Sequence, residues 1–169
     1  RRGGGRVTST LEVGPGPLAT IEALVQERAR KLGLDVTSTD GETRLRRLIA
    51  EEVDRWNDEH RRGGQAIGFP DPGPVVDQAF VNLARYGPIT ALLDDPDVWE
   101  IMINAPDLVF CRRHSGPDGY HPDVFHDDAH VVRTLTKIID DASTSHRKLD
   151  PAAGLQDAQL DDGSRVHIV

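Results

Sequence analysis

Residues 86–113 read YGPITALLDDPDVWEIMINAPDLVFCRR, and within them the chain changes from helical to mixed character. Gly87 and Pro88 predict the start of a short apolar helix over residues 89–93, because the fixed φ of proline suits a first helical turn. The run Asp-Asp-Pro-Asp at 94–97 predicts its end, since the residue before a proline avoids α geometry. This stretch therefore closes one structural region and opens another.

The second half of the stretch predicts a β-hairpin. Residues 98–104, VWEIMIN, are rich in β-branched and aromatic side chains, which favour a strand. Asn-Ala-Pro-Asp at 104–107 predicts a turn, and residues 108–112 are the expected partner strand. Everything before this stretch has helical character, and everything after it is mixed.

Three helices are predicted before residue 86. The first covers residues 18–32, the second follows the capping-box sequence at 39–42, and the third starts near Pro74. Helical spacing assigns their buried faces to Ile21, Leu24, Val25, Ala29 and Leu32, to Leu45, Leu48, Ile49, Val53 and Trp56, and to Val76, Phe80, Leu83 and Ala84.

After the hairpin, the pattern predicts a third strand over residues 120–125, a helix from near Asp127, and a closing hairpin with arms 155–160 and 165–169. The Asp-Gly pair between those arms is a strong hairpin signal. The predicted class is α+β: an all-α region at 18–85, then a small sheet-plus-helix domain at 86–169.

The composition narrows the possible functions. Residues 1–62 carry 12 of the 20 Lys and Arg but 11 of the 28 Asp and Glu, so the net charge of −8 lies in the later part. An acidic surface argues against a nucleic-acid partner, because duplex affinity depends on neutralising phosphates. Residues 1–17, rich in Gly and Pro, are expected to form a flexible tail. No apolar run approaches the roughly 20 residues that span a bilayer.

Four histidines lie close together in sequence and raise the possibility of a metal site. They are His114, His121, His126 and His130. The favoured interpretation is a polar surface around a helix start, because neither a His-Glu-x-x-His motif nor a pair of cysteines accompanies them. No metal is predicted.

Neither nucleophilic catalysis nor nucleotide hydrolysis by this chain alone is indicated. Cys111 is the only cysteine, lies in a predicted strand and has no base assigned to it by the sequence. No Gly-Lys pair occurs anywhere, so the phosphate-binding Walker A loop is absent from the sequence. Arg147 and Arg165 follow loops near the end of the chain, where a guanidinium could reach a neighbour's phosphate, although ordinary surface arginines are the simpler interpretation.

Two blocks of this sequence resemble the N-terminal region of the CpaF/TadA-type ATPases of Tad/Flp pilus and type II/IV secretion systems. The first is the stretch at 86–113, which is similar to the family pattern G-P-L-x-x-L-L-x-D-P-x-V-x-E-I-M-V-N-G-P. The second is RKLDPAAGLQDAQLDDGSRVHIV at 147–169, which is similar to the family's R-R-L/I-D followed by D-A-R-L-p-D-G-S-R-V. The chain departs from that pattern at residues 151–154 and at Gln159.

The resemblance implies the regulatory and assembly part of a hexameric, cytoplasmic ATPase at the inner face of the cell membrane. In that family this region caps a RecA-like motor domain, which binds most of the ATP and Mg. It also implies that Arg165 and Arg147 contact the nucleotide phosphates, and that the catalytic residues lie outside this chain. Since the chain begins without Met and stops within a predicted strand, we expect it to be part of a longer protein.

The partners implied by the resemblance are the motor domain, neighbouring hexamer subunits and inner-membrane secretion components. The alternative is a stand-alone or truncated interaction module that binds secretion components without nucleotide. A metal-dependent hydrolase that uses the histidines is a third, weaker hypothesis.

Overall fold

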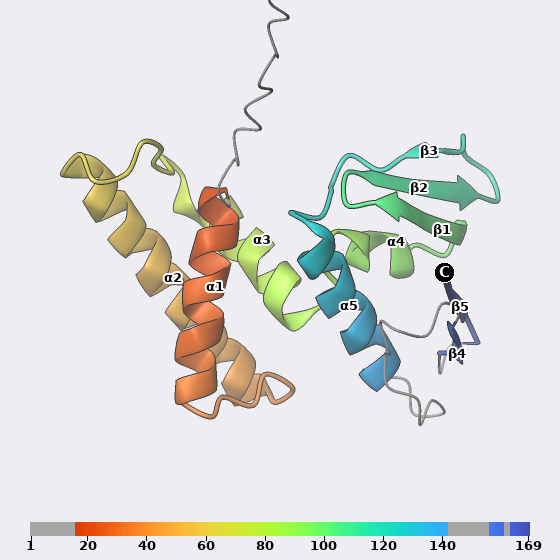
Figure 1. Cartoon of the computed structure of the whole chain (residues 1–169), viewed down its shortest axis with the longest axis horizontal. Coiled ribbons are helices and arrows are strands. Elements are labelled where there is room, and N and C mark those ends of the chain that lie inside the picture. The colour runs from red at the N-terminus through yellow and green to blue at the C-terminus, as the bar shows by residue number, and fades with distance from the viewer. Residues whose placement is uncertain (1–15, 142–155, 161–162) are drawn as a thin grey trace, which may run out of the picture.

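The computed structural model describes residues 16–141, 156–160 and 163–169 (Figure 1). Three helices come first, followed by a small antiparallel sheet, a further helix and a β-hairpin. This confirms the predicted α+β class with a helical N-terminal segment. We call residues 17–84 the helical lobe, and the described residues from 86 onward the α+β lobe.

The helical lobe consists of α1 (Pro17–Lys31), α2 (Thr39–Arg61) and α3 (Pro72–Ala84). The cap of α2 lies one residue earlier than the predicted capping box. Ser38 keeps an extended backbone, and its hydroxyl accepts a hydrogen bond from the Gly41 amide at 3.1 Å. That bond satisfies one of the amides that a helix start leaves open.

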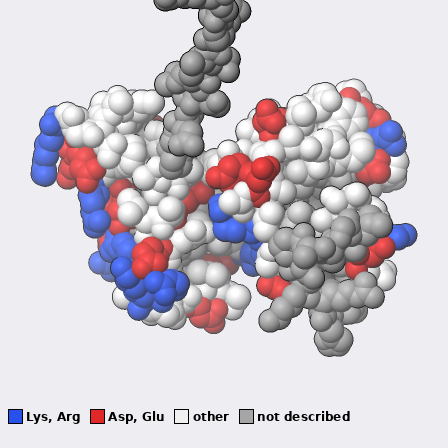
Figure 2. All heavy atoms as spheres, in the orientation of Figure 1, with Lys and Arg blue, Asp and Glu red and all other residues white. Residues whose placement is uncertain are grey.

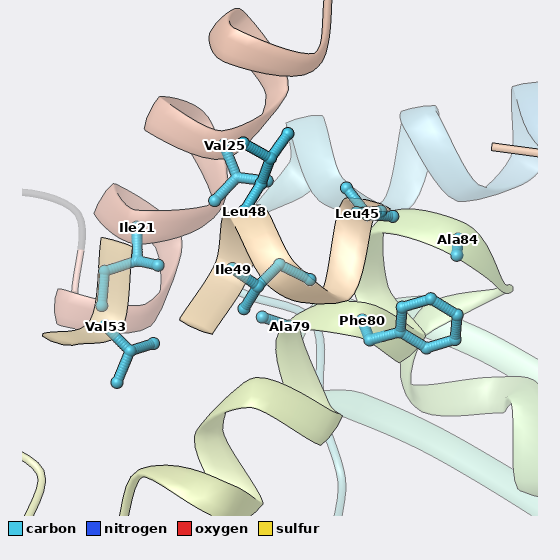
Figure 3. Packing of buried hydrophobic residues seen from close by; sticks show 9 residues of the cluster. All are labelled: Ile21, Val25, Leu45, Leu48, Ile49, Val53, Ala79, Phe80 and Ala84. Atoms are coloured by element: carbon cyan, nitrogen blue, oxygen red, sulfur yellow. The ribbon is translucent and has the colours of Figure 1, made fainter. Parts of the chain in front are cut away.

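Nine buried apolar residues from the three helices point toward one another and form the core of this lobe (Figure 3). They are Ile21, Val25, Leu45, Leu48, Ile49, Val53, Ala79, Phe80 and Ala84. The predicted stripe of α2 is confirmed, with Trp56 half-buried at its edge. For the first helix the predicted buried face was wrong at Leu24 and Leu32, which are 48% and 56% exposed, while Glu22 is buried at 2%.

Residues 86–113 form the start of the α+β lobe. It contains the 3₁₀ turn η1 (Gly87–Ile89), α4 (Thr90–Leu93), β1 (Val98–Ala105) and β2 (Leu108–Arg113). The predicted helix and hairpin are therefore present. The helix opens with a 3₁₀ turn, in which the Thr90 hydroxyl donates to the Gly87 carbonyl at 2.8 Å.

The three-stranded sheet has the order β1-β2-β3 and is antiparallel throughout. Pairing of Ile101 with Cys111 and of Ile103 with Val109 places these four side chains on the face that covers the core. On the opposite face Phe110 pairs with Tyr120, and their rings meet edge to face at 5.2 Å.

The predicted third strand was too long. Only β3 (Gly119–Tyr120) pairs with β2, and residues 121–125 are irregular. Pro122 has no amide hydrogen to donate to a ladder. The Phe125 amide instead donates to the Pro106 carbonyl at 2.9 Å, and its ring is buried in the core at 3% exposure.

Helix α5 (Asp128–Asp141) and the hairpin of β4 (Gln156–Gln159) and β5 (Arg165–Ile168) complete the lobe. The predicted closing hairpin is confirmed, with Gly163 at φ +90° in the turn, a conformation that glycine adopts without strain. The second core is built from every part of the lobe. Its buried members are Ile89, Leu92, Val109, Cys111, Phe125 and Ile138.

Charge is spread unevenly over the two lobes. On the face shown in Figure 2, most Lys and Arg side chains lie over the helical lobe at the left, with acidic side chains among them. Many form ion pairs along or between helices, such as Arg46 with Asp77 at 2.7 Å and Arg85 with Glu42 at 2.7 Å. No uninterrupted basic surface results on the face shown.

Candidate functional site

Arg165 begins β5, directly after the Asp-Gly turn of the terminal hairpin. Side chains alternate along a strand, so Arg165 and His167 share one face while Val166 faces the other. Val166 packs against the core of the α+β lobe, which anchors the hairpin. Arg165 is consequently directed outward, with its side chain 75% exposed.

Asp157 on β4 holds Arg165 in place. Its Oδ1 atom accepts hydrogen bonds from Arg165 Nε at 3.3 Å and Nη2 at 3.1 Å, and from His167 Nδ1 at 2.9 Å. Asp157 pairs with His167 across the hairpin, which brings all three side chains onto the same face. The hydrogen bonds from His167 and Arg165 lower the pKa of Asp157 below its ordinary value.

This arrangement presents an oriented but exposed guanidinium. Exposed ion pairs contribute only about 0–1 kcal/mol, so an incoming anion could replace Asp157 at small cost. A guanidinium offers two parallel donors, a geometry that matches the oxygens of a phosphate or carboxylate. The chemistry that this guanidinium supports is therefore the binding of an anion.

Arg147, the second predicted site residue, lies outside the described residues. The structure therefore shows Arg165 without Arg147. Sequence reasoning missed the supporting role of Asp157, although the alternation of the two hairpin arms around Asp-Gly was sufficient to place it opposite His167.

His114 and His126 are exposed, as the predicted polar surface requires, but His130 differs from that prediction. His130 is only 1% exposed, and burial together with the charge of His126 lowers the pKa of His130 to about 4. The His126 and His130 rings stack with centroids 4.8 Å apart. The prediction was wrong at His130 because a single helix pattern does not reveal that the start of α5 faces the helical lobe.

The other two histidines lie apart from that pair. His121 has Nε2 3.1 Å from the Pro88 carbonyl oxygen and 3.6 Å from an Asp123 carboxylate oxygen. His114 is exposed beside Trp99, with ring centroids 6.5 Å apart. Within the described residues, no group of three or more His, Cys, Asp or Glu side chains is placed to hold a metal ion.

Cys111 faces the core from β2 and is 5% exposed. Its position is therefore that of a packing residue.

The Asp-Pro-Asp segment of the first motif block has a clear structural role. Asp95 forms an ion pair with Arg113 at the end of β2, and its Oδ1 accepts from the Asp97 amide at 3.0 Å. Asp97 in turn accepts from the Ser115 amide at 2.9 Å. Arg113 lowers the pKa of Asp95, so this carboxylate stays ionised and ties the turn after α4 to the far end of the hairpin.

No family model matches the chain, and no curated protein matches it either. Among the described helices, none is both long enough and apolar enough to cross a bilayer.

Proposed function

We propose that this chain is the N-terminal regulatory and assembly part of a hexameric secretion or pilus-assembly ATPase of the CpaF/TadA type. In this proposal residues 86–169 cap a RecA-like motor domain supplied by further sequence, and residues 18–85 form the all-α region before it. The support comes from the two motif blocks, at 86–113 and 147–169, and from the α+β architecture that lies between and around them.

The observation that carries the proposal is the position of Arg165. It stands at the end of the Asp-Gly-Ser turn, is exposed, and is oriented by Asp157. In the proposed mechanism ATP and Mg bind mainly to the motor domain, and Arg165, with Arg147, adds donors to the phosphate oxygens. An arginine in such a position stabilises the negative charge that develops during phosphoryl transfer.

The proposed partners follow from the same assignment. They are the chain's own motor domain, neighbouring subunits of the hexamer, and inner-membrane secretion or pilus components. The proposed place of action is the cytoplasm, peripheral to the inner face of the cell membrane.

The test uses the protein extended through the proposed motor domain. Arg165→Ala should reduce ATP turnover and leave the hexamer intact. The reduction should be about 10³-fold or more if the arginine stabilises the transition state directly. Arg133→Ala, an exposed arginine on α5 in the same lobe, is the matched control and should turn over normally. Normal turnover in Arg165→Ala would remove its assigned role.

A second candidate is an interaction module that never meets nucleotide. The outer side of the sheet favours it, because Trp99 is 53% exposed and Tyr120 67% exposed, and exposed aromatic residues are enriched at protein interfaces. Calorimetry of the extended protein with ATP and magnesium separates the two candidates. Tight nucleotide binding supports the ATPase assignment, and no binding supports the interaction module.

A further inference from the structure

The two lobes have separate hydrophobic cores, and polar side chains from both lobes meet between them. The nine-residue core of the helical lobe contains only residues of α1, α2 and α3, and the second core contains only residues from position 89 onward. Between them, Glu22 of α1 and Asn82 of α3 lie 3.0 Å and 3.4 Å from Nε2 of His126, which precedes α5. In Figure 1, α5 accordingly lies on the side of the α+β lobe nearest α1 and α3.

Glu22 is the centre of this contact. Its side chain is 3% exposed, and each carboxylate oxygen accepts one hydrogen bond from a different element. Asn82 Nδ2 donates to Oε1 at 2.7 Å, and His126 Nε2 donates to Oε2 at 3.0 Å. A buried carboxylate is costly unless it is paired in this way, so the bond from His126, the one that crosses between the lobes, favours the docked arrangement.

The α+β lobe holds His126 ready for that contact. The His126 backbone amide donates to His130 Nδ1 at 3.3 Å, and the rings of the two residues stack. The His130 amide donates to Asp127 Oδ1 at 2.7 Å, and the His130 ring packs edge to face on Phe125 at 5.1 Å. His126 is thus positioned by its own lobe before it meets Glu22.

The covalent link between the lobes is short and has a feature of a hinge. Helix α3 ends at Ala84, and only Arg85 and Tyr86 separate it from Gly87. Gly87 has φ +56°, a backbone region that glycine enters freely and other residues rarely adopt. Hinges are formed by a few residues at the ends of elements that absorb such changes in φ and ψ.

We propose that Glu22, Asn82 and His126 form a releasable latch between the lobes, with residues 85–87 as the hinge on which the helical lobe swings. An apolar interface would lose its hydrophobic gain when opened. A polar contact exchanges its hydrogen bonds for bonds to water, at a net cost of only about 0.5–3 kcal/mol each. The proposal rests on the contacts of this chain and is independent of the ATPase assignment.

The first experiment measures the distance between the lobes. Spin labels at Asp54→Cys on α2 and Pro117→Cys in the turn before β3 occupy exposed positions, and the native Cys111 is buried. We expect one narrow distance distribution in the unaltered chain, and a broad one that extends to longer distances in Glu22→Ala. Glu27→Ala, an exposed glutamate on the same helix, is the control and should keep the narrow distribution. An unchanged distribution in Glu22→Ala would overturn the latch.

The second experiment distinguishes release from unfolding. His126→Ala removes the partner from the other lobe, and should produce the same distance distribution as Glu22→Ala, with no further change in the double variant. Hydrogen exchange should become at least about tenfold faster at residues 86–87 and 126–134, and should stay unchanged in the interior of α2. Loss of protection throughout α2 in both single variants would assign the contact to folding of the helical lobe and overturn the proposal.

Discussion

The helical lobe and the α+β lobe build cores from contacts of different range. In the helical lobe, α2 alone contributes four of the nine buried residues, and they recur at helical spacing within nine positions. In the α+β lobe, the six buried residues are spread over η1, α4, β2, the irregular segment before α5 and α5, and only Val109 and Cys111 share an element. The first core is specified by local periodicity, and the second requires the chain to be folded before its members meet.

This difference shows which elements need the rest of their lobe in order to bury their apolar residues. Each helix of the first lobe presents its own apolar face, so removal of one side chain leaves the pattern of the others intact. In the second lobe, Phe125 lies in an irregular segment and is held only by its tertiary surroundings and one backbone hydrogen bond. We therefore expect the truncation of a single side chain in the second core to destabilise the whole α+β lobe.

The largest expected effect comes from a pair of core truncations, one in each lobe. Phe125→Ala should lower the free energy of unfolding by about 3–5 kcal/mol, and Ile49→Ala by about 2–5 kcal/mol, because each leaves a cavity in a buried position. Hydrogen exchange resolved by segment checks where the loss occurs. Phe125→Ala should accelerate exchange across β1, β2 and α5 together, and Ile49→Ala should act mainly on α1 to α3. If either variant loosens both lobes equally, the two cores form one cooperative unit and the comparison fails.

The second effect is a pH dependence that arises at the boundary between the lobes. His130 has a folded-state pKa of about 4 against an ordinary value of 6.5, so the native state binds fewer protons than the unfolded chain between these values. The contribution of neutral His130 to the free energy of unfolding is therefore fully present above pH 6.5. It is lost as the pH drops toward 4, by a total on the order of 3 kcal/mol. The charges of His126, Glu22, Arg133 and Asp127 also act on the pKa of His130.

Urea unfolding between pH 4 and 7 measures this dependence. Asp35, Asp95 and Asp157 have lowered pKa values and lose their contributions only at lower pH, below the ordinary range of carboxylates. Replacing His130 by Asn should therefore flatten the stability curve between pH 4 and 6.5, and His114→Asn, at an exposed position, should leave it unchanged. A curve that keeps its slope without His130 would show that other groups carry the dependence.

Much of the fold could be predicted from the sequence, and the same contrast between local and long-range contacts explains the rest. The α2 stripe, the first hairpin and the Asp-Gly hairpin were predictable because periodicity, β propensity and turn chemistry act over a few residues. The exposed Leu24 and the buried Glu22 were not, because the face of α1 that is covered depends on where the second lobe docks. From the sequence of α1 alone, Leu24 is the better candidate for burial because it is apolar. Glu22 is buried instead because Asn82 and His126 lie beside it and bind its carboxylate.

The candidate site divides in the same way. The exposure of Arg165 follows from strand alternation around a recognisable turn, and so does the position of Asp157 opposite His167. The burial of His130 has no local signal, since histidine at a helix start is ordinarily solvated. His130 is buried where α1 and α3 approach His126, through a contact that spans 104 positions of the chain.

The smallest expected effect is a difference in the free energy of unfolding between two glycine-to-alanine variants. The two glycines have nearly the same backbone conformation, so the difference separates the cost of packing from the cost of backbone strain. Gly33 has φ +58° with no atom within 4 Å of an added Cβ, whereas an added Cβ at Gly87, φ +56°, would lie 3.1 Å from His130 Nε2. Each glycine-to-alanine change should cost about 1–2 kcal/mol for the left-handed backbone. Gly87→Ala should cost more than Gly33→Ala because His130, stacked on His126 and packed on Phe125, has little freedom to move away. Chemical denaturation of both variants measures the difference, and equal losses would mean that the junction of the two lobes yields to a methyl group as readily as an open turn within one of them.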